Sequence, residues 1–246
     1  MLSLGQRDGA IVPIAHQGTI GTIAPSLCPK QGCALPLTKA RLKPGEVVCD
    51  LGSGSGAEAI EAARLVGPGG FVYGLDIAPE TLATARLAAA EAAIGNLEFI
   101  ECFIEDIPLN DNTVDAIISN CALNLSKKRE SVLAEAFRIL KPGGRLLIAD
   151  IVLLDTSLEQ EVQQTITPVL GCLNGVLPYE EYPQLLAQCG FSAIETELFQ
   201  QFTIDRLLSR AKKRLMHEAQ AMLEHTEGAQ RINGAFASVY LMARKP

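Results

Sequence analysis

The stretch that decides the fold is Val47-Val48-Cys49-Asp50-Leu51-Gly52-Ser53-Gly54-Ser55-Gly56. A run of strand-forming apolar residues ends at an acid, three glycines then alternate with serines, and a helical pattern follows. Because glycine has no Cβ, such a loop turns sharply and lets the backbone approach a bound molecule closely. A glycine-rich loop between a strand and a helix is where open α/β sheets bind nucleotide-like ligands. The stretch therefore predicts a ligand-binding loop at the edge of a sheet.

Strand and helix patterns alternate on both sides of this loop. We expect strands at 47–51, 71–76, 97–102, 114–120, 145–152, 191–197 and 235–243. We expect helices at 56–66, from 79 to the Gly95-Asn96 stop, and at 131–140, 159–170, 179–188 and 204–223. Short turns rich in glycine and proline connect the first strands and helices, as in Lys141-Pro142-Gly143-Gly144. This order predicts an α/β protein with a parallel sheet covered by helices on both faces.

Composition and charge narrow the range of partners. The chain has 246 residues and a net charge of -7 at pH 7, so a nucleic-acid partner is not expected. The longest apolar stretch, 146–154, contains Asp150 and is too short to span a bilayer, and the chain opens with no secretory signal pattern. We therefore expect a cytoplasmic protein without a membrane partner. The oligomeric state stays open.

Cysteine usage suggests thiols rather than disulfides. The number of cysteines is odd, and no pair has the Cys-x-x-Cys spacing of a zinc ribbon. In a cytoplasmic protein we expect all of them to be reduced. Cys49 and Cys102 fall within predicted strands and Cys189 at a helix end, so we assign these three to core or structural positions. The full set is Cys28, Cys33, Cys49, Cys102, Cys121, Cys172 and Cys189.

The glycine loop allows two interpretations. Gly52-x-Gly54-x-x-Ala57 fits the dinucleotide fingerprint, and Asp76 follows at the distance of a ribose-binding acid, which would suit an NAD-dependent oxidoreductase. Asp50, however, places a carboxylate beside the position of the pyrophosphate, where like charges repel. S-adenosylmethionine carries a sulfonium and an ammonium and no phosphate, so Asp50 suits the ammonium and Asp76 the ribose hydroxyls. These residues favour the methyl donor.

The loop, Asp76 and the Lys141-Pro142-Gly143-Gly144-Arg145 turn resemble the class I S-adenosylmethionine-dependent methyltransferases over roughly residues 40 to 155. The resemblance implies a Rossmann-like seven-stranded, mostly parallel sheet with helices on both faces, an antiparallel last strand and small C-terminal additions. Phe103 stands where the family usually has an acid for adenine, so Phe103 packing and the Ile104 backbone would hold the base. The implied cofactor-binding residues are Asp50, Gly52, Ser53, Gly54, Gly56, Asp76, Ile77, Phe103, Ile104 and Asn120.

Three further cysteine contexts resemble the arsenite methyltransferases of this class. They are Gly32-Cys33 ahead of Pro36, Ser119-Asn120-Cys121 ahead of Asn124-Leu125, and Gly171-Cys172. The resemblance implies that Cys33, Cys121 and Cys172 are catalytic and together bind As(III), a soft centre that matches thiolate ligands. It also implies arsenite or its thiol conjugate as the small-molecule substrate, a role in arsenic detoxification, and an external thiol reductant such as glutathione or thioredoxin. The additional upstream cysteine usual in the family has no simple match here, because Cys28 has a different spacing.

The expected organisation has three parts. Residues 1–40 form an N-terminal arm or cap with the cysteine loop, 41–155 the S-adenosylmethionine-binding core, and 156–246 a half that completes the sheet and covers the acceptor site. Two other functions remain open beside the arsenite methyltransferase and the less favoured oxidoreductase. One is a small-molecule C- or O-methyltransferase of the ubiquinone/menaquinone-methylating type, and the other is a non-catalytic arsenite-binding protein on the same scaffold.

Overall fold

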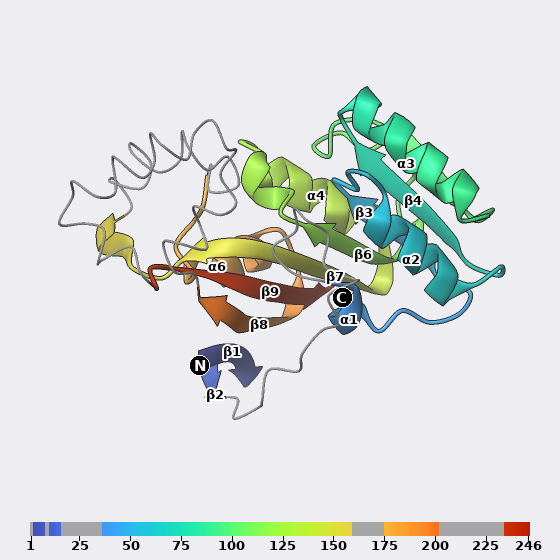
Figure 1. The fold of residues 1–246 in the computed structure, drawn as a ribbon. Helices are drawn as coiled ribbons and strands as arrows, with labels where there is room; N and C mark the ends of the chain where they lie inside the picture. Colours follow the sequence, from blue (N-terminus) through green and yellow to red (C-terminus); the bar gives the residue numbers. More distant parts are fainter. Residues whose placement is uncertain (1, 8–9, 16–35, 159–174, 202–233) are drawn as a thin grey trace, which may run out of the picture.

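The computed structural model describes residues 2–7, 10–15, 36–158, 175–201 and 234–246, which build one nine-stranded sheet (Figure 1). The strand order is β2-β1-β8-β9-β7-β6-β3-β4-β5. The strands are β1 Leu2–Arg7, β2 Ala10–Ala15, β3 Val47–Leu51, β4 Phe71–Asp76, β5 Leu97–Glu101, β6 Val114–Asn120, β7 Leu140–Leu153, β8 Ser192–Gln201 and β9 Phe236–Arg244. The glycine loop leaves the sheet at its β3 position, between β6 and β4.

Helices cover both faces of the sheet. One apolar core joins α1, α2 and α3 to one face, and a second core joins α4 and α6 to the other. The helical segments are α1 Leu37–Ala40, α2 Ala57–Val66, α3 Pro79–Glu91, η2 Leu123–Leu125, α4 Arg129–Ile139, η3 Thr156–Leu158 and α6 Glu181–Gln188. Among the described residues, no helix combines the length and the apolar character needed to cross a bilayer. The layered α/β architecture predicted from the sequence is confirmed.

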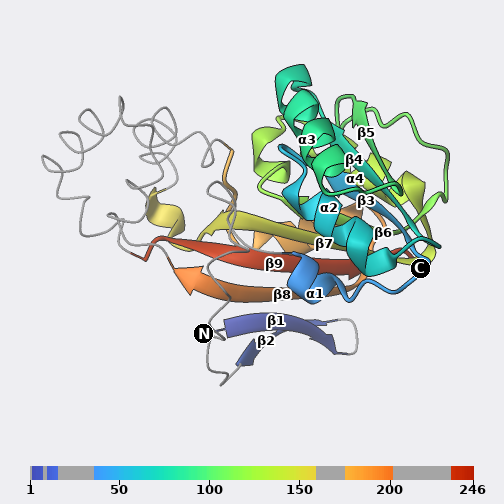
Figure 2. The ribbon, with the colours of Figure 1, turned by 45° about the vertical axis from the view of Figure 1, so that its right-hand side comes forward.

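Seven of the strands have the predicted topology. Strands β3, β4, β5, β6 and β7 pair in parallel, and β9 runs antiparallel to both β7 and β8. The prediction that the last strand is antiparallel is therefore confirmed. An N-terminal hairpin of β1 and β2 extends this seven-stranded sheet, because β1 pairs with β8 (Figure 2). No period in the N-terminal sequence indicates this pairing, which joins segments far apart in the chain.

Element boundaries differ from the predicted ones by a few residues. Helix α4 begins at Arg129, β5 ends at Glu101, and β7 begins at Leu140, with a register shift opposite Val114 and Ala116. The pairing of β7 thus starts ahead of the Lys141-Pro142-Gly143-Gly144 sequence that predicted a turn. The helices expected at 159–170 and 204–223 lie outside the described residues.

Parallel pairing brings the carboxyl ends of four strands to one edge. Leu51 is opposite Leu75 and Ser119, Asp76 is opposite Glu101, and Asn120 is opposite Ala149. Ligands of open α/β sheets bind outside such carboxyl ends. The residues that follow these strands are therefore the candidates for a binding site.

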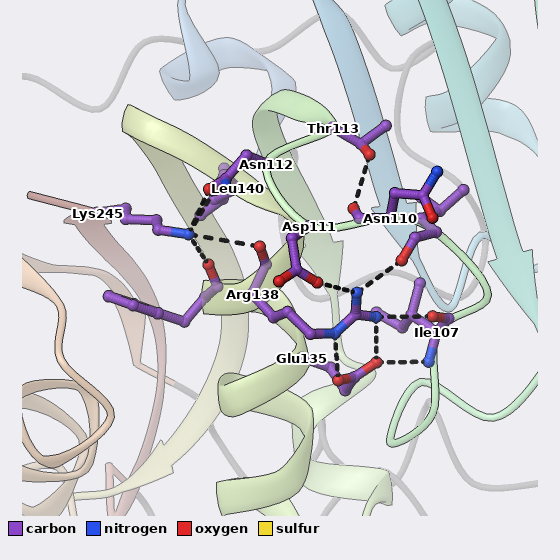
Figure 3. A network of polar contacts seen from close by, with 11 residues as sticks. Ile107, Asn110, Asp111, Asn112, Thr113, Glu135, Arg138, Leu140 and Lys245 are labelled. Carbon is purple, nitrogen blue, oxygen red and sulfur yellow. Dashed lines mark hydrogen bonds and ion pairs between the residues drawn. The ribbon is translucent and has the colours of Figure 1, made fainter.

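The opposite, amino edge carries a dense polar network around the end of α4 (Figure 3). The Arg138 guanidinium donates to the carbonyls of Ile107 and Leu109, at 2.8 and 2.7 Å, and it binds both Glu135 and Asp111. Lys245 donates to the carbonyls of Phe137 and Leu140, both at 2.8 Å, beyond the end of the helix. A cation is favourable there, because the last carbonyls of a helix lack partners within the helix. The network fixes α4 against the β5–β6 connection and the C-terminal residues.

Candidate active site

The glycine loop is held at the carboxyl edge by its neighbour β4. The backbone N–H of Ser53 donates to the carbonyl of Leu75 at 2.8 Å, and that of Gly54 donates to Asp76 Oδ2 at 2.9 Å. Gly56 ends the loop with φ 82°, and a Cβ there would lie 2.6 Å from the Phe99 ring. A larger residue at this position would therefore be strained and would also clash with the ring. Glycine is required at Gly56 for both reasons.

Asp76 lies beside the loop, as the sequence predicts for a ribose-binding acid. Its Oδ1 accepts the backbone N–H of Ala78 at 2.9 Å, while Oδ2 accepts that of Gly54. A carboxylate has about four lone-pair sites, so both oxygens can accept further hydroxyl donors. Ile77, the next residue, is 52% exposed beside this acid and offers an apolar surface to a ligand.

Three buried oxygen atoms lie unpaired around the loop. Asp50, Ser53 and Glu58 are 2%, 9% and 8% exposed, and Asp50 Oδ2, Ser53 Oγ and Glu58 Oε2 have no hydrogen-bond partner. Most buried polar atoms in native proteins are hydrogen-bonded, and leaving one unpaired costs about 1–3 kcal/mol. Two buried acids, each with one oxygen that lacks a donor, and an unpaired hydroxyl form a site that suits a ligand bringing N–H groups or positive charge.

The two acids retain protons more strongly than exposed carboxylates do. Burial raises the pKa of Asp50 well above its usual value, and the nearby Glu58 and Asp76 raise it further. Burial also raises the pKa of Glu58 to about 7, against a hydrogen bond from Asn120. A pyrophosphate would meet this pair as like charges, whereas a cation would stabilise their ionised forms. These hydrogen-bond acceptors therefore fit the ammonium of S-adenosylmethionine and do not fit the pyrophosphate of a dinucleotide.

Glu58 also lies at this candidate site, although the sequence did not predict it. It lies in the first turn of α2, and Asn120 at the end of β6 donates its side-chain amide to Glu58 Oε1 at 2.6 Å. Asn120, predicted as a cofactor-binding residue, thus also connects the start of α2 to β6. The signal in the sequence was an acid within the apolar pattern Ala59, Ile60, Ala63, but periodicity alone did not place Glu58 against Asp50.

The segment after β5 presents the residues predicted for adenine. Phe103 is 61% exposed, and Ile104 is half-buried against the core that α4 and α6 share. The backbone N–H of Asp106 donates to the Phe103 carbonyl at 3.1 Å, which closes a turn around Ile104. An exposed aromatic ring at this edge is available to pack on a base.

Cys121 lies in a tight turn that contacts the glycine loop. It follows β6 with φ 60°, a left-handed conformation that is uncommon for a residue with a side chain, and its N–H donates to the Ala149 carbonyl at 2.8 Å. A Cβ on Gly52 would lie 2.6 Å from the Ala122 Cβ, so the turn packs directly on the loop. Residues in such rare backbone conformations cluster at functional sites. The structure thus brings Cys121 together with the predicted cofactor residues.

The other two predicted arsenic ligands, Cys33 and Cys172, lie outside the described residues. Cys121 itself is disulfide-bonded. The prediction that every cysteine is a reduced thiol is therefore wrong at Cys121. Cys121 must be reduced before it can bind a metalloid.

Cys49, Cys102 and Cys189 are free thiols. Cys49 is fully buried in β3, whereas Cys102 follows the end of β5 instead of lying within the predicted strand. Burial raises the pKa of Cys49 well above its usual value, that of Cys102 to about 11, and that of Cys189. Since the thiolate is the metal-binding form, these three are poor ligands.

Comparison with known proteins identifies the family of this chain. A methyltransferase domain family matches residues 42–220. The chain belongs to this family. Its fold is that of the class I, S-adenosylmethionine-dependent methyltransferases, which the sequence resemblance predicted. The resemblance is therefore confirmed at the level of family and fold.

Two kinds of relative match this methyltransferase chain in sequence. An arsenite methyltransferase from Halobacterium salinarum is 37% identical over 164 residues, covering 67% of this chain and 42% of the relative. A ubiquinone/menaquinone biosynthesis C-methyltransferase from Vibrio cholerae is 36% identical over 110 residues, covering 44% of this chain and 42% of the relative. The matched part of the chain thus spans less than half the length of either relative.

Among solved structures, the chain is similar to an arsenic (III) S-adenosylmethionine methyltransferase from Chlamydomonas reinhardtii. The two share 28% sequence identity with a TM-score of 0.62, and the match covers 91% of this chain and 70% of the algal protein. The similarity thus extends well beyond the glycine loop and includes the C-terminal part of the chain.

Proposed function

We propose that this methyltransferase transfers a methyl group from S-adenosylmethionine to trivalent arsenic bound by Cys33, Cys121 and Cys172. The observation that carries the proposal is the Cys121 turn, which packs against the glycine loop through Ala122 and Gly52. A thiol in this turn would therefore be near a cofactor bound at the glycine loop. The match to the Halobacterium arsenite methyltransferase covers 67% of the chain, whereas that to the quinone-type enzyme covers 44%.

The cofactor residues have separate roles in this proposal. Asp50 and Glu58 accept hydrogen bonds from the ammonium and stabilise the positive end of the cofactor. Asp76 accepts hydrogen bonds from the ribose hydroxyls. Phe103 and Ile77 pack on the adenine, and the backbone of Ile104 binds its edge. S-adenosylmethionine supplies an electrophilic methyl group on its sulfonium. The protein contributes mainly the relative position of the two reactants, which by itself can account for a large part of a rate enhancement.

The acceptor side rests on the chemistry of sulfur. Three thiols replace the hydroxides of arsenite, water leaves, and the lone pair of arsenic stays free to attack the methyl group. Soft thiolates suit a soft, thiophilic centre. No general base is needed for this transfer. The disulfide at Cys121 supports a requirement for an external thiol such as glutathione or thioredoxin, because only the reduced form can bind arsenic. We place the reaction in the cytoplasm, where such reductants are present.

A C-methyltransferase of the quinone type is the second candidate, on the strength of the Vibrio relative. The exposed Leu125 at the carboxyl edge, 59% exposed, is the observation in its favour, because an apolar acceptor needs such a surface. It requires no thiol in the Cys121 turn. A non-catalytic arsenite-binding protein would instead need the thiols and no cofactor turnover.

The test is methylation of arsenite by the reduced protein. We expect S-adenosylhomocysteine and methylated arsenic in equal early amounts when protein, arsenite, glutathione and S-adenosylmethionine are incubated together. Cys121→Ser should reduce the rate at least 100-fold and leave S-adenosylmethionine affinity within about twofold, since serine is a poor ligand for a soft metalloid.

Cys189→Ser is the matched control, because this thiol is half-buried at the end of α6, and its rate should equal that of the wild type. Turnover of a quinone-like phenol with no turnover of arsenite would favour the second candidate. Arsenite binding without any cofactor consumption would favour the non-catalytic protein.

A further inference from the structure

A buried polar cluster lies directly behind the Cys121 turn. It consists of Asn124 in η2, Asp150 in β7 and Tyr182 in α6, which are 2%, 0% and 1% exposed. Burying polar groups is costly unless they bind one another, and apolar residues of the same size would pack the same space without that cost. The cluster is therefore a specific arrangement and not a filler of the core.

Asn124 is the centre of this cluster and is attached at three points. Its backbone N–H donates to Asp150 Oδ2 at 3.1 Å, and its side-chain amide donates to the Ile151 carbonyl at 2.7 Å. Its side-chain carbonyl accepts the hydroxyl of Tyr182. Asp150 is itself fixed, because its Oδ1 accepts the Ile151 N–H at 2.8 Å. The three bonds tie the residue after the turn to β7 and α6.

The same strand holds the other end of the turn. Cys121, three residues before Asn124, donates its N–H to the carbonyl of Ala149, the neighbour of Asp150 in β7. Between the two attachments, Ala122 packs on Gly52. A cysteine with positive φ persists only when its surroundings hold it there. The attachments at Cys121 and Asn124 are the contacts that do so.

The cluster also reaches the chain that follows Cys172. Arg129, the first residue of α4, donates to the carbonyl of Gly175, and a Cβ on Gly175 would lie 2.9 Å from the Asn124 carbonyl oxygen. Gly175 is three residues beyond Cys172 in the sequence. Gly175, which follows the proposed ligand Cys172, thus packs against Asn124, and Asn124 in turn anchors the turn that carries the proposed ligand Cys121.

We propose that Asn124, Asp150 and Tyr182 are positioning residues that hold the Cys121 turn against the glycine loop. The inference deepens the proposed function and rests on it for its catalytic consequence, because these residues act through Cys121 and touch no reacting atom. It assigns a role to a buried hydroxyl and a buried carboxylate that the transfer reaction itself does not use. Loosening the cluster releases the turn, which exposes the thiol and slows the transfer at the same time.

The test compares two buried tyrosines. Tyr182→Phe removes the hydroxyl that binds Asn124, and Tyr179→Phe removes a hydroxyl that lies 2.7 Å from Thr196 Oγ1 in the same region. The two changes have the same chemistry and similar burial, 1% and 6% exposed, but the Tyr182 hydroxyl binds Asn124, next to the Cys121 turn. Fully reduced protein is used, and iodoacetamide labelling of Cys121 is followed by peptide mass spectrometry with Cys102 as the internal reference.

For Tyr182→Phe we expect Cys121 labelling at least threefold faster relative to Cys102, arsenite turnover about tenfold slower, and S-adenosylmethionine affinity within twofold of the wild type. For Tyr179→Phe both rates should match the wild type. Equal effects of the two variants, or unchanged labelling in Tyr182→Phe, would overturn the proposal. If Tyr182→Phe does not fold, Asp150→Asn serves as the second variant, since it keeps the shape and removes the charged acceptor, and the same changes are expected.

The labelling result separates this inference from the proposed function. Faster labelling in Tyr182→Phe without arsenite turnover by the wild type would support the positioning role and reject arsenite as the substrate. Arsenite turnover by the wild type with identical labelling in all variants would support the substrate and reject the positioning role.

Discussion

Polar side chains gather at both edges of the parallel part of the sheet, and they are paired in opposite ways. At the amino edge, Arg138 binds two carboxylates and two carbonyls, and it holds the pKa of Glu135 below its usual range (Figure 3). At the carboxyl edge, Asp50 and Glu58 each have an oxygen without a partner and raised pKa values. One edge is complete without a ligand, whereas the other needs a cation to complete it. This difference supports our proposal of a cation-binding site at the carboxyl edge, independently of any motif.

The largest effect is expected at the carboxyl edge. Asp50→Asn should weaken S-adenosylmethionine binding about 100-fold, because a hydrogen bond to a charged group contributes roughly 1.5–3 kcal/mol. The free energy of unfolding should not fall, since the change removes an acid that lies close to Glu58. Calorimetric titration and thermal unfolding measure the two quantities.

Asp115→Asn is the matched control for this change. Asp115 is an aspartate of the amino edge, where it binds Lys141 and the backbone N–H of Val47. The Asp115→Asn substitution should leave the affinity for S-adenosylmethionine within twofold of that of the wild type. A comparable loss of affinity in both variants would mean that the effect is a general loss of fold and not the loss of a cation site.

The second effect is expected at the amino edge, in stability. Arg138→Met removes the bonds to Ile107, Leu109, Glu135 and Asp111, and we expect a loss of about 2 kcal/mol in the free energy of unfolding. For a chain of this size that corresponds to a melting temperature lower by about 4–8 °C. Cofactor affinity at a temperature below unfolding should be unchanged. An affinity loss as large as that of Asp50→Asn would contradict the division between the two edges.

A smaller stability effect is expected at Lys245. Its ammonium binds the carbonyls of Phe137 and Leu140 and the Asn112 side chain beyond the C-terminus of α4. Lys245→Ala should lower the free energy of unfolding by about 0.5–1 kcal/mol, the upper part of the range that a cation at a helix C-terminus contributes. Urea unfolding should show it, while Lys127→Ala, at an exposed lysine preceding α4, should stay within about 0.3 kcal/mol of the wild type. Equal losses in both variants would reject the capping role.

The sequence was a good guide where a local pattern determines the structure. The structure has the expected strand at 47–51, the expected loop from Gly52 to Gly56 and the expected acid at Asp76. Alternating glycines directly after a strand specify a tight turn, so the local sequence is sufficient to predict them. The antiparallel final strand was also expected, although only from the family resemblance. Local chemistry and family topology together thus predicted the scaffold of the cofactor site.

The sequence was a poor guide where contacts join distant residues. Glu58 meets Asn120 across 62 positions, and Tyr182 meets Asn124 across 58, so neither pairing follows from periodicity. The hairpin of β1 and β2 joins the sheet through β8, whose position depends on the rest of the fold. The disulfide at Cys121 likewise depends on which segments the fold brings together. These features required the three-dimensional arrangement.

Proton release on cofactor binding tests most directly the claim that the incomplete edge is a cation site. Glu58 has a pKa of about 7 because burial disfavours its charge, so it is mostly protonated at pH 6.5, and a bound cation lowers its pKa again. Affinity should therefore rise with pH from 6 to 7.5. Titrating S-adenosylmethionine at pH 6.5 in two buffers of different ionisation enthalpy should show release of about one proton. Glu58→Gln should release clearly less, and Glu135→Gln as much as the wild type. Binding by the wild type without proton release, at an affinity independent of pH, would contradict the account.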